Sequence, residues 1–112
     1  MTRTLGLAMA ASTLTVAFAA MSADQDTLLA YGRHLAAECT SCHKLDGTPG
    51  AIPSILGKSH DEFIDLLEAY RDGRKLNPVM VSVAKSLDDE QMAALATYFS
   101  SLTAPNSGAS LK

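Results

Sequence analysis

A five-residue segment, Cys39-Thr40-Ser41-Cys42-His43, constrains this chain more than any other feature. Two cysteines separated by two residues and followed at once by a histidine are the pattern of a c-type haem attachment site. Each thiol would form a thioether bond to one porphyrin, and the histidine would lie under the ring with an imidazole nitrogen facing the iron. Cys39 and Cys42 are the only cysteines in the chain. The motif therefore predicts one covalently bound haem c.

Three other interpretations of the two cysteines stay open at this level. In an exported chain the main structural alternative is a disulfide between Cys39 and Cys42, because disulfides persist outside the cytosol. A thioredoxin-like dithiol would need the cysteine pair to open a helix in a βαβ unit, but here the pair follows a predicted helix. A structural zinc site would need four ligands, and only Cys39, Cys42 and His43 cluster in the sequence.

The first 23 residues have the pattern of a secretory signal peptide. Arg3 is the only charged residue before Asp24, and residues 5–20 are apolar, Gly, Ser or Thr. The run ends in an A-x-A cleavage signal at residues 17–19, with a second possible exit after Ala23. A retained membrane anchor is the alternative, although the run is slightly short for a span of about 20 residues. The sequence thus predicts a periplasmic protein with no membrane span after cleavage.

The remaining chain is expected to form one small domain over residues 24–102, with a flexible tail over 103–112. Loss of Arg3 would leave 8 basic residues against 12 acidic ones, a formal charge of −4. Such a balance argues against a nucleic-acid partner. Aromatic residues make up only 5% of the chain and Trp is missing, so a large planar cofactor would fill volume that aromatic side chains usually occupy.

Helical periodicity and helix-end signals predict an all-α fold, and no segment convincingly resembles a strand. A capping-box start at Ser59 and Glu62 and a stop at Gly73 delimit one helix. The stretch that follows the motif contains three glycines and two prolines, so it is expected to be a loop. The expected helices cover about 26–38, 60–72 and 79–84, with a last helix starting at Ser86, and the loop covers 44–58.

Two axial ligands to the iron are expected. His43 is the first, and Met80, which we expect in a loop just past Asn77-Pro78 rather than mid-helix, is the best candidate for the second. Met92 is the rival sulfur, but it lies in the apolar stripe of the last helix, where a methionine usually fills the core. His34 and His60 would give bis-histidine ligation, although a solvated histidine is the plainer interpretation of both.

The loop after the motif is expected to hold the histidine. A ligating imidazole usually donates its other ring N–H to a carbonyl or carboxylate, and we expect the Pro53 carbonyl to accept from His43, with Pro49 as the competitor. A polar cluster before Met80 would partner the haem propionates, form part of a docking face, or simply be a solvated loop. Its members are Arg71, Arg74, Lys75 and Asn77.

With these residues in hand, residues 27–102 resemble a class I cytochrome c of the short bacterial periplasmic type. The resemblance rests on Gly32, the motif at 39–43, and residues 53–57, 77–80 and 95–99. It implies an all-α fold of about four helices wrapped round one covalently bound haem. The family's proximal histidine, loop proline and distal methionine map to His43, Pro53 and Met80, and its helix crossing would pair Gly32 with Tyr98 or Phe99.

More narrowly, residues 51–57 and 68–80 are similar to cytochrome subunits of flavocytochrome c sulfide dehydrogenase and to small domains of dihaem periplasmic cytochromes. These resemblances imply a monohaem electron-transfer protein that is not itself an enzyme. Its partners would be redox proteins, either met briefly by a free carrier or bound as a flavoprotein dehydrogenase subunit. A haem enzyme or sensor with an open iron site, and a haem-free dithiol protein, are the remaining interpretations.

Overall fold

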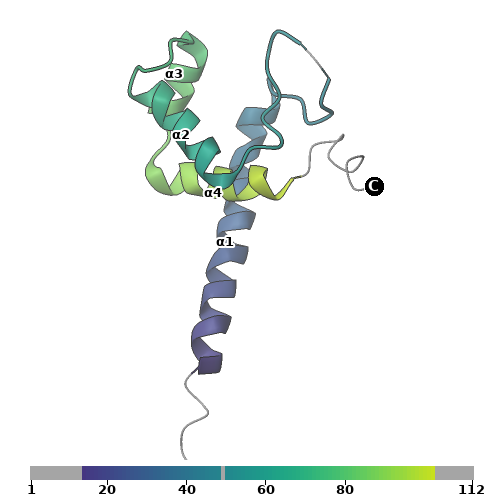
Figure 1. The fold of residues 1–112 in the computed structure, drawn as a ribbon, viewed down its shortest axis with the longest axis vertical. Coiled ribbons are helices and arrows are strands. Elements are labelled where there is room, and N and C mark those ends of the chain that lie inside the picture. The colour runs from purple at the N-terminus through teal and green to yellow at the C-terminus, as the bar shows by residue number, and fades with distance from the viewer. Residues whose placement is uncertain (1–13, 49, 103–112) are drawn as a thin grey trace, which may run out of the picture.

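The structure is a computed structural model that describes residues 14–48 and 50–102. Its described residues form helices, turns and loops with no strand, so the all-α prediction is confirmed. In Figure 1, α4 crosses α1, and α2 and α3 lie together above α4. The four helices are α1 (Leu14–Thr40), α2 (His60–Arg71), α3 (Pro78–Lys85) and α4 (Asp89–Ser101).

Side-chain caps fix where the three shorter helices begin. Ser59 and Glu62 form a reciprocal capping box at the start of α2, as the sequence predicted. The last helix begins later than the expected start at Ser86. Asp88 is its N-cap and forms a second capping box with Gln91, while Ser86 instead ends α3 as its C-cap. The positive φ of Gly73, 78°, follows the end of α2 at the expected place.

The first helix is much longer than the expected 26–38. It begins at Leu14 and therefore includes the second half of the predicted signal peptide. No Gly or Pro interrupts the chain between Leu14 and Gly32, so nothing in this stretch breaks helical hydrogen bonding. The rest of the predicted signal peptide, residues 1–13, and the predicted tail, 103–112, lie outside the described residues. No described helix contains a stretch that is both long and apolar enough to cross a membrane.

The core is built round α4, which packs against α1 and α2. Its apolar stripe supplies the largest fully buried side chains, Met92, Leu95 and Phe99. The Phe99 ring stacks on Phe63 of α2 with ring centroids 5.2 Å apart. Because α2 also packs against α3, this small core links α1 and α3 through α2 and α4. The core thus connects α1, which leads into the motif at 39–43, to α3, which carries Met80.

Candidate haem-binding site

The motif at 39–43 forms a turn at the end of α1. The backbone N–H groups of Cys42 and His43 both donate to the carbonyl of Cys39, at 3.2 and 2.8 Å. This turn leaves Cys39 partly buried and Cys42 exposed, and both are free thiols. His43 is turned inward and is only 9% exposed. One turn of chain therefore presents two thiols and one buried imidazole.

The partly buried thiol of Cys39 is not an activated nucleophile. Burial raises its pKa above the ordinary thiol value, and the neighbouring charge of Glu38 raises it further. Reactive dithiols work through the opposite shift, a lowered pKa in an electropositive surrounding. The surroundings of Cys39 thus argue against the redox-dithiol interpretation of the motif.

The imidazole of His43 is held by the loop that follows the motif. Its Nδ1 lies 2.7 Å from the carbonyl oxygen of Pro53. A carbonyl can only accept, so Nδ1 carries the proton in this bond, and in the neutral ring Nε2 keeps its lone pair for another partner. The expected contact with Pro53 is thus present, while Pro49 lies outside the described residues.

Met80 lies in the first turn of α3, so the brief helix expected over 79–84 is present and the expectation that Met80 lies in a loop is wrong. Its side chain is partly buried and packs against the main core cluster. Met92 belongs to that cluster and is 1% exposed, as its place in the apolar stripe predicted. Of the two methionines, Met80 is the one at the edge of the core, within reach of a group bound beside it.

The two other histidines both face solvent. His34 is exposed on α1, and His60 is half-exposed at the start of α2, where its Nδ1 lies 3.2 Å from Asp61. Neither is buried as His43 is. Among the described residues, no three His, Cys, Asp or Glu side chains gather in a way that could hold a metal ion. A zinc site at Cys39, Cys42 and His43 therefore has no support from the part of the chain that the structure describes.

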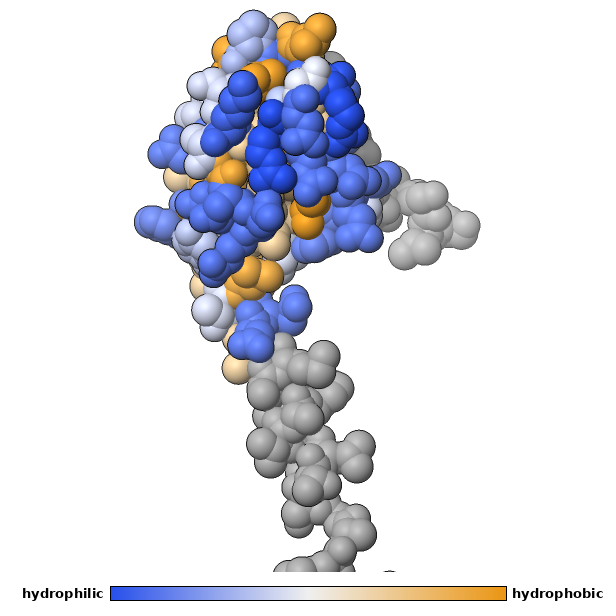
Figure 2. Space-filling view, turned by 90° about the vertical axis from the view of Figure 1, so that its left-hand side faces the viewer, coloured by the Kyte–Doolittle hydropathy of each residue, from blue (hydrophilic) through white to orange (hydrophobic). Residues whose placement is uncertain are grey.

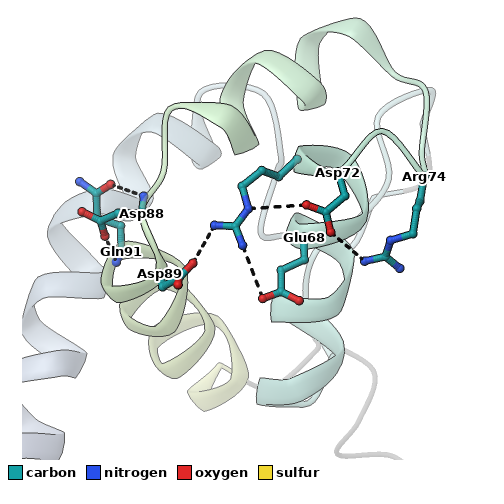
Figure 3. Close-up of polar contacts among 7 residues, drawn as sticks. Glu68, Asp72, Arg74, Asp88, Asp89 and Gln91 are labelled. Carbon is teal, nitrogen blue, oxygen red and sulfur yellow. Dashed lines mark hydrogen bonds and ion pairs between the residues drawn. The ribbon is translucent and has the colours of Figure 1, made fainter.

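The polar cluster before Met80 is largely occupied by contacts within the protein. The Arg71 guanidinium lies 2.7 Å from Asp89 of α4 and also pairs with Glu68 of α2 and with Asp72, the C-cap of α2 (Figure 3). Arg74 pairs with Asp72 at 3.6 Å. These contacts tie Arg71 to the junction of α2 and α4 and leave it little freedom to bind a second anion.

Lys75 and Asn77 also have partners in the fold. The Lys75 ammonium lies over the Tyr70 ring, 5.7 Å from its centroid. The Asn77 side chain is the N-cap of α3. Sequence reasoning missed this role, although an asparagine directly before a proline at the first helical position is a helix-start signal.

These residues fit a covalently attached haem. Cys39 and Met80 pack against the same core cluster, together with Leu45 and Ile55 from the loop after the motif. The motif, the loop and α3 thus all pack against one core cluster. Two free thiols, a buried imidazole with its Nδ1 proton engaged, and a partly buried thioether are the donors that a c-type haem needs. Leu45 is an apolar neighbour of this site that sequence reasoning did not single out.

Comparison with known proteins points to the same cofactor. The family model for cytochrome c matches residues 29–103. A protein named cytochrome c-553 from Nitratidesulfovibrio vulgaris is 34% identical over 90 residues, which are 75% of this chain and 81% of that protein. The cytochrome subunit of sulfide dehydrogenase from Chlorobaculum tepidum is 34% identical over 76 residues, 67% of this chain and 69% of that subunit.

A thiosulfate dehydrogenase electron acceptor from Thiomonas intermedia is also similar. It is 40% identical over 70 residues, which are 60% of this chain but only 32% of that protein. The chain thus spans about a third of that relative and corresponds to one part of it. The names of these relatives describe both small cytochromes and electron acceptors of dehydrogenases.

Proposed function

This chain belongs to the cytochrome c family, and we propose that it is a periplasmic carrier of single electrons whose haem iron is ligated by His43 and Met80. As a member of this family it is an electron-transfer protein and not an enzyme, and its one C-x-x-C-H motif corresponds to one covalent haem c. We assign the two thioether bonds to Cys39 and Cys42. When bound, the haem supplies an iron that gains or loses one electron.

The observation that carries this proposal is the hydrogen bond between His43 and Pro53. The Pro53 carbonyl holds the Nδ1 proton at 2.7 Å, which fixes the orientation of the ring and makes Nε2 more basic towards a metal. The imidazole is buried and directly follows the two cysteines in sequence, as a haem ligand of this motif would be. Pro53 thus acts on the iron through His43.

Met80 would complete the coordination. Ligation by a thioether and an imidazole would favour reduced iron and raise its reduction potential, and with both protein ligands bound the iron would take no substrate. The partly buried position of Met80 against the core supports this role. The chain's own contribution is therefore to hold two ligands in place and to keep water from the iron, which suits a carrier better than an enzyme or a sensor.

A matched pair of substitutions tests the proposal. A pyridine haemochrome assay first establishes one haem c per chain. The ferric wild-type protein should then show the charge-transfer band of methionine-ligated haem. This band should vanish in Met80→Leu and persist in Met92→Leu, because the second change conserves volume in the core. If the wild-type protein lacks the band and its reduced form readily binds carbon monoxide, His43/Met80 ligation is wrong.

A second candidate role is that of electron-accepting subunit in a dehydrogenase for reduced sulfur compounds. Similarity to the sulfide dehydrogenase cytochrome subunit and to the thiosulfate dehydrogenase electron acceptor favours it. On the face seen in Figure 2, however, apolar side chains are scattered among hydrophilic ones, which suits brief encounters better than a permanent interface. Co-elution with a sulfide-oxidising flavoprotein would favour the subunit role, and a protein that stays monomeric beside it would favour the free carrier.

A further inference from the structure

One residue satisfies every backbone donor in the first turn of α3. Pro78, at the first position, has no N–H. The next two N–H groups, those of Val79 and Met80, both donate to Asn77 Oδ1 at 3.1 Å. The fourth, that of Val81, donates to the Asn77 carbonyl at 2.8 Å. Asn77 therefore holds the turn that carries Met80, and one of its bonds is to Met80 itself.

The loop in front of this turn offers Met80 little other support. Residues 72–79 are all exposed, and Leu76 and Val79 are among the most exposed large apolar side chains of the described chain. The Met80 side chain packs against the core cluster. Its backbone is held at the other end by Asn77, so the position of the sulfur depends on both.

We propose that Asn77 is a positioning residue for Met80, whose N-cap keeps the thioether on the iron. This inference rests on the proposed ligation by Met80. The cap and the bound sulfur both require an intact first turn of α3. If the sulfur leaves the iron when this turn unwinds, removal of the cap lowers the free energy needed to detach Met80 from the iron. Asn77 then acts without touching the haem.

The test measures how easily an added ligand displaces Met80. Imidazole binds ferric haem only after the sulfur has left, so its apparent affinity reports the population without Met80 on the iron. Asn77→Ala should bind imidazole about five-fold more tightly than wild type, as loss of a typical N-cap implies. Asn77→Ser keeps a cap and should stay within about two-fold of wild type. Asn77→Gly, a weaker perturbation, replaces the Ala variant if that protein does not accumulate.

Ser59→Ala is the matched control. Ser59 is the N-cap of α2, which carries no proposed ligand, so this variant should lose stability to urea like Asn77→Ala but keep the wild-type imidazole affinity. The Asn77 proposal is overturned if Ser59→Ala shifts imidazole affinity as much as Asn77→Ala. It is also overturned if Asn77→Ser behaves like Asn77→Ala, or if neither Ala nor Gly at position 77 changes the affinity.

Failure of the proposed Met80 ligation would give different results from failure of the Asn77 proposal. In that case wild-type protein would lack the methionine charge-transfer band, and Met80→Leu would bind imidazole no more tightly than wild type. With the band present and Met80→Leu binding far more tightly, unchanged affinity in the Asn77 variants contradicts the positioning role alone.

Discussion

Gly32 of α1 faces the backbone of Ala94 of α4 with no room for a side chain between them. A β-carbon on Gly32 would overlap the Ala94 carbonyl oxygen, and it would lie 2.6 Å from the carbonyl carbon and 2.8 Å from Tyr98 Cβ. The helix crossing implied by the resemblance is therefore present. It pairs Gly32 with Ala94 and Tyr98, whereas Phe99 turns into the core and stacks on Phe63.

We expect Gly32→Ala to destabilise the protein although alanine is the better helix former. The added methyl group would meet backbone atoms that cannot rotate away, so α1 and α4 must separate. The cost of overpacking, about 1–3 kcal/mol, should exceed the gain in helix propensity of about 1 kcal/mol. Urea unfolding of the haem-loaded protein, followed by circular dichroism, measures the change.

Gly50→Ala is the control for that experiment. A β-carbon at Gly50 would meet nothing within 4 Å, so its stability should stay within about 0.5 kcal/mol of wild type. A Gly32→Ala protein as stable as wild type would show that the helices can part at little cost.

The contact between His43 and Pro53 uses a backbone carbonyl, so the proline ring itself should be replaceable. Pro53→Ala keeps the acceptor and should leave the absorption spectrum of the haem unchanged. It should cost about 0.4–1 kcal/mol of stability, because the unfolded chain gains freedom. Spectra and urea unfolding of the same samples check both expectations. A changed spectrum would mean that the ring, and not only the carbonyl, fixes the imidazole.

The capping box of α2 should make the stability of the protein pH-dependent. The Ser59 backbone N–H donates to Glu62 at 2.7 Å and, with the Ser59 side chain, lowers the pKa of this carboxyl. A lowered pKa in the folded state means that the carboxylate stabilises the fold above its ordinary pKa. This stabilisation is lost as the pH falls through the lowered value.

Glu62→Ala should therefore be less stable than wild type at neutral pH, and the difference should shrink on acidification below the ordinary carboxyl range. Thermal unfolding at a series of pH values measures it. Asp65→Ala, at an exposed position of the same helix that takes no part in the cap, is the control. A deficit for Glu62→Ala that stays constant down to low pH would exclude the charged form as its source.

The ion pair between Arg71 and Asp89 should couple α2 to α4 measurably. Arg71 is 29% exposed and Asp89 86% exposed, and their closest atoms are 2.7 Å apart. For a pair so open to water we expect a coupling free energy of about 0.5 kcal/mol in a double-mutant cycle to alanine, reduced by added salt. The Arg74–Asp72 pair is longer, at 3.6 Å, and its arginine is more exposed, so it should show less coupling. Equal coupling in both cycles would contradict the bridging role of Arg71.

The sequence by itself determined the parts of this protein that depend on neighbouring residues. Covalent haem attachment follows from the spacing of Cys39, Cys42 and His43, because local chemistry alone sets it. The starts of α2 and α3 were close to the prediction, since a cap acts over three or four residues. The start of α4 was misplaced because Ser86 and Asp88 are both good N-caps, and only the end of α3 decides between them.

Only the tertiary structure decided which distant groups meet. No local rule assigns Arg71 to Asp89 or Gly32 to Ala94, since these contacts exist only once α4 lies across α1 and beside α2. The tertiary structure also decided the position of Met80. The sequence indicated this residue as a candidate ligand, and the fold places it at the edge of the core. Its backbone is held by a local cap and its side chain by distant packing. Spacing along the chain can therefore indicate candidate ligands, but only the packing of α3 on the core can set where the Met80 sulfur lies.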